Sequence, residues 1–409
     1  MKELYVRALA IAGFALLAAC SGGSMNQTVP AGTTGGPVPM LGLNNNAPNT
    51  RALCDFLPAP GYARCFALAR TDVTPRKGVQ PNFTPSGFGP PDLVSAYKLP
   101  HGLLSGKGQI IAAVDAYDDP NAESDLAIYR TQFGLPTCST ANKCFQKVNQ
   151  SGQTSPLPQP NAGWAGEISL DLDMVSAACP HCKIILVEAT SNSFANLGTS
   201  NDTAVNMKAN AVSNSYGGGE SGGTNSHYDH PGHIILASSG DGGYGAQSPC
   251  SYATVVCVGG THLTRGGGTR GWTETAWRGA GSGCSGVVLK PSWQTDTGCT
   301  MRSESDVSSV ADPSSGVAVY DTYQSHGWQV YGGTSASSPF IAGVYGLAKN
   351  AAKQNYAASI WAAGGSKKLN DVTSGSNGTC PSQYLYICTA GVGYDGPTGW
   401  GTPWGVKAF

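Results

Sequence analysis

Five short apolar runs, separated by stretches with helical patterning, limit this chain to a small number of fold classes. The runs lie at 109–115, 184–188, 211–215, 234–238 and 254–258. Each has the length and composition of a strand buried inside a sheet. Helices are expected between some of them, at 122–132, 166–178 and 201–209. This alternation predicts an α/β fold, in which a parallel β-sheet is flanked by helices on both faces.

The N-terminus has the pattern of an export signal. Lys2 and Arg7 precede an apolar run at 8–19, which is too short to span a bilayer. The run ends in Leu-Ala-Ala directly before Cys20, which resembles a bacterial lipobox. We expect residues 1–19 to be a lipoprotein signal peptide, and Cys20 to carry acyl chains that anchor the protein in the bacterial cell envelope. The alternatives are an ordinary signal peptide with an incidental cysteine, and secretion into the medium.

Cysteine usage also indicates export. The chain holds 13 cysteines, and without Cys20 an even number remains. They fall into close pairs, which an oxidising compartment would convert to disulfides. Pairing between neighbours is predicted, although spacing alone does not fix the connectivity: Cys54/Cys65, Cys138/Cys144, Cys179/Cys182, Cys250/Cys257, Cys284/Cys299 and Cys380/Cys388.

Composition separates a tether, an arm and one large domain. Residues 20–53 are rich in Gly, Ser, Thr, Asn and Pro, and are predicted to form a flexible tether. Residues 54–91 contain one cysteine pair and several prolines, and are interpreted as a short arm on the domain of residues 92–409. Charged residues make up only 12% of the chain and the net charge is −1. Nothing therefore indicates a nucleic-acid partner, and we expect a monomer.

A glycine turn followed by a serine and an apolar helical run is the strongest local signal of chemistry. Ser335 follows Gly333 and Thr334, and Pro339 fits early in the helix. The first turn of a helix offers free N–H groups and a positive dipole end, so a serine there is well placed to act as a nucleophile. The alternative is that Thr334 or Ser335 is merely an N-cap.

A serine nucleophile needs a base, and none of the seven histidines lies in a motif that would supply one. His227, His230 and His233 are interpreted as part of a solvated loop and not as metal ligands. Carboxyl groups are the remaining candidates. Glu167 and Asp171 are four residues apart, so they share one face of a helix. One could act as the base while the other orients it, and the alternative is a solvated acidic face.

A third carboxyl follows an apolar strand. Asp241 lies in a Gly-Asp-Gly-Gly sequence directly after the run at 234–238. Open α/β sheets bind their ligands at the carboxyl ends of strands, so this position favours a functional role. The alternative is an ordinary turn aspartate.

Together these segments resemble the sedolisin family, the serine-carboxyl peptidases with a subtilisin-like fold. The resemblance runs from about Pro90 to the C-terminus and rests on several motifs in order: Glu167 with Asp171, residues 213–217, Ser239-Gly240-Asp241, residues 258–261, and Gly333-Thr334-Ser335-Ala336 with Pro339. It implies a serine-type endopeptidase that hydrolyses peptides or proteins at acid pH. Ser335 would be the nucleophile, Glu167 the base and Asp171 its orienting partner. Asp241, held protonated, would donate to the oxyanion.

The resemblance also implies a calcium loop near the C-terminus. Asp371 and Asp395 would supply carboxylate oxygens, and Val372, Gly391 and Gly393 backbone carbonyls. Hard oxygen ligands of this kind suit Ca²⁺.

The N-terminal region departs from the family pattern. Family members usually carry a large prosegment that assists folding and blocks the site, whereas only residues 21–91 separate Cys20 from the domain. The arm is therefore either a vestigial prosegment or unrelated to folding. Two other functions stay open: a catalytically inactive peptide-binding lipoprotein on the same fold, and a histidine-dependent esterase or peptidase. Asp115 ends an apolar run and is interpreted as structural.

Overall fold

The computed structural model describes residues 49–54, 58–222 and 225–409. The predicted signal peptide, Cys20 and most of the predicted tether lie outside these residues. Within them, no helix is long and apolar enough to cross a membrane. The described residues all belong to one compact unit of the chain.

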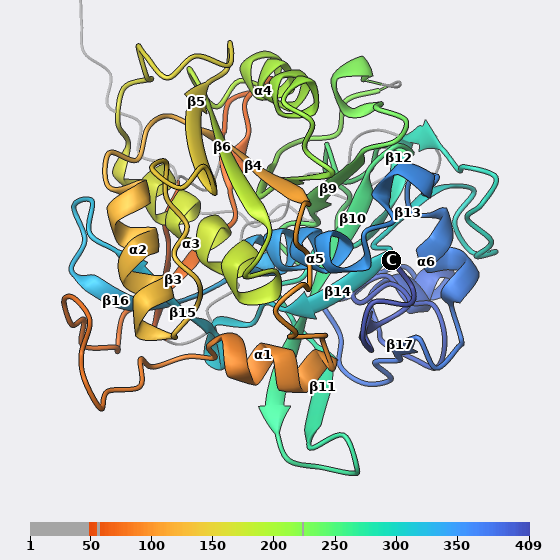
Figure 1. The fold of residues 1–409 in the computed structure, drawn as a ribbon. Helices are drawn as coiled ribbons and strands as arrows, with labels where there is room; N and C mark the ends of the chain where they lie inside the picture. Colours follow the sequence, from red (N-terminus) through yellow and green to blue (C-terminus); the bar gives the residue numbers. More distant parts are fainter. Residues whose placement is uncertain (1–48, 55–57, 223–224) are drawn as a thin grey trace, which may run out of the picture. The chain divides into compact units, whose positions relative to one another are not determined.

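An eight-stranded sheet forms the centre of the fold, with the strand order β11-β10-β9-β7-β4-β6-β5 and β14 paired to β10 (Figure 1). All of its pairs are parallel except β10 with β11. The strands are β4 (Ile110–Ala116), β5 (Phe145–Asn149), β6 (Lys183–Ala189), β7 (Ala211–Asn214), β9 (Ile234–Ser238), β10 (Val256–Arg265), β11 (Trp272–Ala276) and β14 (Val307–Val310). The predicted runs therefore form strands, although β10 continues beyond the predicted end at residue 258.

Alternate side chains of the central strands enter two separate cores. On β4, Ile111 and Ala113 pack with helices α3 (Ala162–Ala178) and α5 (Thr334–Ala348). Ala112 and Val114 point to the other face and pack with α4 (Phe194–Asn206). Successive side chains of a strand point to opposite faces, so a sheet covered on both sides needs apolar residues at every position. The predicted parallel sheet with helices on both faces is confirmed, although α4 begins and ends earlier than predicted.

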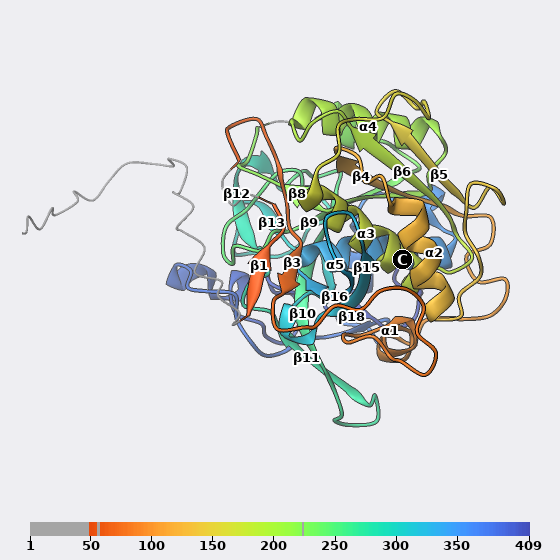
Figure 2. The same ribbon diagram turned by 90° about the vertical axis from the view of Figure 1, so that its left-hand side faces the viewer.

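A second sheet, in the order β1-β3-β16-β15, joins the arm to the segment that leads to Ser335. Its strands are β1 (Thr50–Ala52), β3 (Leu68–Arg70), β15 (Val317–Asp321) and β16 (Gly327–Gly332). In Figure 2 the strands β1 and β3 run side by side. Residues 50–52, which lie within the predicted tether, form β1 and pair with β3.

Shorter elements complete the fold. They are β2 (Arg64–Cys65), β8 (Tyr216–Gly217), β12 (Gly283–Leu289), β13 (Met301–Glu304), β17 (Leu369–Asn370), β18 (Thr402–Pro403), α1 (Pro90–Tyr97), α2 (Ala122–Gln132), α6 (Ala358–Ala363), and the 3-10 turns at Ser226–Tyr228, Pro313–Ser315, Ala351–Lys353 and Ser382–Ile387. The disulfides join the neighbouring cysteines in all six predicted pairs.

Candidate active site

Ser335 lies in the first turn of α5, buried beneath the carboxyl end of the central strands. The turn into the helix uses Gly333, whose φ of 100° is a conformation that L side chains rarely adopt. A side chain there would also collide with the backbone, because an added Cβ would lie 1.9 Å from the oxygen of Phe66. The Ser335 hydroxyl donates to the carbonyl of Ser215, just beyond β7, at 3.3 Å. The glycine turn therefore delivers the hydroxyl to the sheet edge at the helix N-terminus.

Asp241 reaches the same helix turn from the end of β9. Its Oδ1 accepts hydrogen bonds from the Thr334 N–H at 2.8 Å and from the Thr334 hydroxyl at 2.9 Å. Two further bonds fix Thr334, since its hydroxyl accepts from the Gly240 N–H and its carbonyl from the Ser238 hydroxyl. The carboxyl is thereby held one residue from Ser335.

Glu167 and Asp171 approach Ser335 from one face of α3. Both are fully buried, as their spacing in the helix and the packing of α3 against α5 require. Asp171 Oδ1 accepts from the Ser215 hydroxyl at 2.7 Å, and the Ser215 carbonyl accepts from Ser335. Glu167 Oε2 accepts from the Ala67 N–H of the arm at 2.8 Å. The alternative interpretation of these residues as a solvated acidic face is wrong.

Asp115 belongs to the same cluster, which was not predicted from the sequence. It lies near the end of β4 and is fully buried, and neither of its carboxyl oxygens has a hydrogen-bond partner among the described residues. Burial raises the pKa of Glu167 and of Asp171, and the charge of Asp115 adds to both shifts. The sequence signal was its position at the end of a strand that neighbours β7, because parallel strands end at one edge of the sheet.

Burial dominates the electrostatics of the cluster. It raises the pKa of Glu167 and Asp171 well above the usual range of carboxyl groups, and the Ser335 hydroxyl opposes the shift at Glu167. It raises the pKa of Asp241 to about 7, against hydrogen bonds from Thr334 and the charge of Arg64. It raises the pKa of Asp115 to about 8. Carboxyls without water or countercharge keep their protons, so this site retains protons that isolated carboxyls have lost.

The histidines take no part in this arrangement. All seven lie in the described residues, and none hydrogen-bonds to Ser335 or Glu167. His227 and His230 contact Asp202, and His233 contacts the carbonyl of Ala209. Among the described residues, the only group of three side chains close enough to hold a metal is Cys250, Cys257 and Glu304, and its cysteines form a disulfide.

The predicted calcium ligands come together in a loop at the C-terminal end. The Gly393 N–H donates to Asp371 at 2.9 Å, and the Gly391 N–H to Asp395 at 3.1 Å. Asp395 is buried, which raises its pKa to about 7, and the charge of Asp371 adds to the shift. Two carboxylates that repel each other lie in one loop, and carboxylate oxygens are ligands that suit Ca²⁺.

Sequence comparison finds kumamolisin and sedolisin among the relatives of this chain, and no protein-family model matches it. Kumamolisin of Bacillus sp. (strain MN-32) is 29% identical over 365 residues, which cover 79% of this chain and 63% of kumamolisin. Sedolisin of Pseudomonas sp. (strain 101) is 34% identical over 176 residues, which cover 39% of this chain and 29% of sedolisin. The chain thus spans less than two thirds of the length of these relatives.

A comparison with solved structures finds a protein with a similar fold. The structure of Pseudomonas sedolisin, a serine-carboxyl proteinase complexed with two molecules of pseudo-iodotyrostatin, matches with a TM-score of 0.64 at 23% identity, covering 78% of this chain and 96% of sedolisin. The parallel sheet, with its serine at the start of a buried helix, is a subtilisin-like fold. The chain is therefore similar in sequence to these peptidases and shares the fold of sedolisin.

Proposed function

We propose that this protein is a serine-type endopeptidase that works at acid pH. The observation that supports the proposal best is the burial of the Ser335 hydroxyl together with Glu167, Asp171 and Asp241 at one end of the sheet. A hydroxyl is a weak nucleophile unless a neighbouring base takes its proton. Around Ser335 the neighbouring bases are carboxyl groups.

The proposed roles follow from the contacts of each group. Ser335 attacks the carbonyl carbon of a peptide, and Glu167 takes the hydroxyl proton and then passes it to the leaving amine. Asp171, fixed by the Ser215 hydroxyl, orients Glu167 and shares its proton. Glu167 keeps one carboxyl oxygen, Oε1, without a hydrogen-bond partner among the described residues, which leaves it available for proton transfer.

Asp241 and the Ser335 N–H are proposed to stabilise the oxyanion. A carboxyl can donate a hydrogen bond only while it is protonated, and the pKa of about 7 keeps Asp241 protonated in acid. As pH rises through about 7 this proton is lost, and with it the oxyanion donor. At the same time Glu167 must be ionised to act as base. The expected optimum is therefore acidic, below the Asp241 pKa of about 7.

The test is hydrolysis of a peptide library by the purified protein across the pH scale. We expect an acidic optimum for the wild type and no turnover for Ser335→Ala. Ser337→Ala is the matched control, because this hydroxyl lies on the same helix but donates to the carbonyls of Ser309 and Val310. An alkaline optimum, or full activity in Ser335→Ala, would refute the proposed chemistry.

We further propose that Ca²⁺ binds the C-terminal loop through Asp371, Asp395 and the carbonyls of Val372, Gly391 and Gly393. When bound, the ion would neutralise the two carboxylates and tie the loop ends together. Binding to the native state alone raises its stability, so a chelator should lower the melting temperature of the wild type. Asp395→Asn should melt at the lower temperature with or without chelator.

Export and anchoring are proposed from the sequence alone. Cys20 would carry acyl chains and hold the enzyme at the cell envelope, with peptides or proteins as substrates. Incorporation of a labelled fatty acid by the wild type, and its loss in Cys20→Ser, would test this step. An unlabelled wild type would leave secretion as the route.

A further inference from the structure

A set of exposed lysines lies where the parallel strands of the central sheet begin, opposite to the end of the sheet that holds Ser335. Lys183 is the first residue of β6, and Lys98 and Lys349 end the helices α1 and α5. The loop from α1 to β4 runs across α5 (Figure 1), and its Leu104 carbonyl accepts from the Lys349 ammonium at 3.1 Å. The ends of two helices and the start of a strand thus gather their lysines on one surface.

The C-terminal segment extends this surface. The Trp404 N–H donates to the carbonyl of Lys368 at 3.3 Å, and the Lys98 ammonium lies 5.9 Å from the centre of the Trp404 ring. This surface is named the basic face. Its lysines are all exposed: Lys98, Lys107, Lys183, Lys349, Lys367, Lys368 and Lys407.

Within the described residues, no carboxylate side chain forms an ion pair with the basic face. The lysines that do pair with carboxylates belong to β5 and to the loop after β12. Carboxylates at the border of the face are already bound, because Glu274 is paired with Arg270 and Asp229 accepts from the Tyr356 hydroxyl. Neither Asp nor Glu occurs in the segments 98–110, 179–184, 348–370 and 403–409. The net charge of −1 therefore conceals a surface of one sign.

Exposed apolar side chains stand among these lysines. Leu103 and Leu104 lie between Lys98 and Lys107 in the chain, and they are 84% and 68% exposed. Trp404 is also exposed. Single exposed apolar residues are common on protein surfaces, whereas a cluster with a polar rim marks an interaction site. Lysines that surround leucines are typical of a surface that lies on a membrane, with the apolar side chains at the boundary of the acyl chains and the cations at the lipid phosphates.

A purely structural explanation accounts for only part of the basic face. The helix dipole favours a lysine at the C-terminal end of a helix, which explains Lys98 and Lys349. It explains neither Lys183 and Lys367 nor the exposed leucines. A nucleic acid fits less well than a membrane, because the segments of the face contain no arginine, the residue preferred for nucleic-acid recognition. Leucines also gain nothing from a phosphate backbone.

We infer that the basic face docks this domain on a membrane surface that carries anionic phospholipids. Leu103 and Leu104 enter the boundary between head groups and acyl chains, and the surrounding lysines attract the lipid phosphates. Either contribution alone is weak, and together they hold the domain in one orientation. The inference depends neither on the proposed peptidase activity nor on acylation of Cys20.

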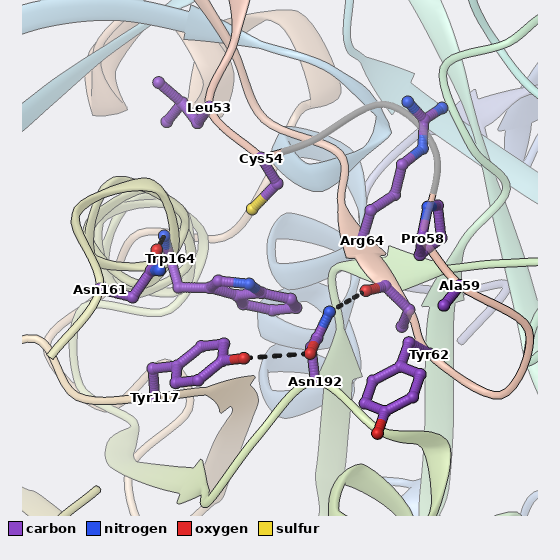
Figure 3. Close-up of a pocket in the computed structure, with 11 residues that line it drawn as sticks. Leu53, Cys54, Pro58, Ala59, Tyr62, Arg64, Tyr117, Asn161, Trp164 and Asn192 are labelled. Carbon is purple, nitrogen blue, oxygen red and sulfur yellow. Dashed lines mark hydrogen bonds between the residues drawn. The ribbon is translucent and has the colours of Figure 1, made fainter. Parts of the chain in front are cut away.

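Docking in this way would keep the candidate active site away from the membrane. β4 has seven residues, so the two ends of the sheet are roughly 20 Å apart. A pocket beside the arm lies at the far end, because its lining includes Tyr117 and Asn192, which follow β4 and β6 (Figure 3). Figure 3 shows these two side chains hydrogen-bonded to each other, next to Trp164. A docked domain would therefore leave this pocket and Ser335 on the side that faces the solvent.

The test is co-sedimentation of the full chain with lipid vesicles, in a Cys20→Ser background so that no acyl chain contributes. We expect binding to vesicles of equal parts phosphatidylcholine and phosphatidylglycerol, no binding to pure phosphatidylcholine, and weaker binding as salt is added. Lys107→Gln and Lys349→Gln should each weaken binding about fivefold. Leu103→Asp should weaken it at least about tenfold.

Two matched control variants lie outside the basic face. Lys77 is an exposed lysine of the arm that packs beside Gly327 of the second sheet, and Leu289 on β12 is 76% exposed. Lys77→Gln and Leu289→Asp should bind like the parent chain. The melting temperature of every variant checks that it is folded, as substitutions at exposed positions should be.

Several results would overturn the inference. A folded chain that does not bind the anionic vesicles, or that binds both kinds of vesicle equally, has no anionic membrane site. Equal losses in the control variants would show that the basic face is not the surface in contact. Binding that the lysine variants weaken but Leu103→Asp does not, together with equal affinity for duplex DNA, would assign the face to a soluble polyanion instead.

Discussion

Two clusters of buried carboxyl groups each include at least one residue of helix α3, and they differ in whether their oxygens accept hydrogen bonds. In the catalytic cluster, Asp115, Glu167 and Asp171 each keep at least one oxygen without a hydrogen-bond partner among the described residues. In the structural cluster, Asp173 accepts from the Tyr320 N–H, Asp125 from Thr322, and Asp321 from Tyr331 and Tyr323.

The comparison shows that burial alone does not identify a catalytic acid. Burial is the first cause of a raised pKa in both clusters. Unsatisfied buried oxygens cost stability, so a fold keeps them only where another requirement outweighs that cost. The satisfied acids of the structural cluster tie α2, α3 and β15 together, whereas the unsatisfied ones surround the serine.

The largest expected effect separates the two clusters on one helix. Glu167→Gln should lower kcat/KM by roughly 10²–10⁴, the range for loss of a general base. Asp173→Asn, six residues further along α3, should change kcat/KM far less, because Asp173 contacts Tyr320 and not the serine. Steady-state kinetics with one peptide checks both variants. Equal losses would mean that the division into two clusters is wrong.

A somewhat smaller loss is expected at the oxyanion. Asp241→Ala should lower kcat by about 10²–10³ with little change in KM, as removal of one oxyanion donor does. It also removes the group with a pKa of about 7, so the alkaline limb of the kcat profile should shift. A variant that raises KM and leaves kcat unchanged would assign Asp241 to substrate binding instead.

Much of this architecture could be predicted from the sequence, because it depends on local patterns. Apolar runs predicted the central strands, and the four-residue spacing placed Glu167 and Asp171 on one face of a helix. The place of Asp115 beside Glu167 and Asp171 was not predicted, since it depends on which strands are neighbours in the sheet. The path of the arm could not be predicted either, because the bond from Ala67 to Glu167 joins residues 100 positions apart.

Asp115 offers the next test of the comparison. Burial raises the pKa of Asp115 to about 8, so its charge develops only as pH rises through that value, where it raises the pKa of Glu167 and Asp171 further. Asp115→Asn should therefore leave the acid limb of the kcat/KM profile in place and move the alkaline limb, because an amide does not titrate. A profile with both limbs unchanged would return Asp115 to a purely structural role.

The smallest effect concerns stability, and it tests the structural cluster. Burial raises the pKa of Asp125 to about 6, so its proton binds more tightly in the folded state than in the unfolded one. The stabilisation is complete below the unfolded pKa near 4, and it is lost as pH rises through about 6.

Urea unfolding of the inactive Ser335→Ala chain between these limits would measure the change. We expect the free energy of unfolding to fall by roughly 1–3 kcal/mol through this one group as pH rises. Adding Asp125→Asn should flatten that part of the profile, because an amide does not titrate. If the slope is unchanged, the pH dependence of the free energy of unfolding comes from the buried acids of the catalytic cluster and not from Asp125. The stability of the fold in acid would then depend on its active-site carboxyls.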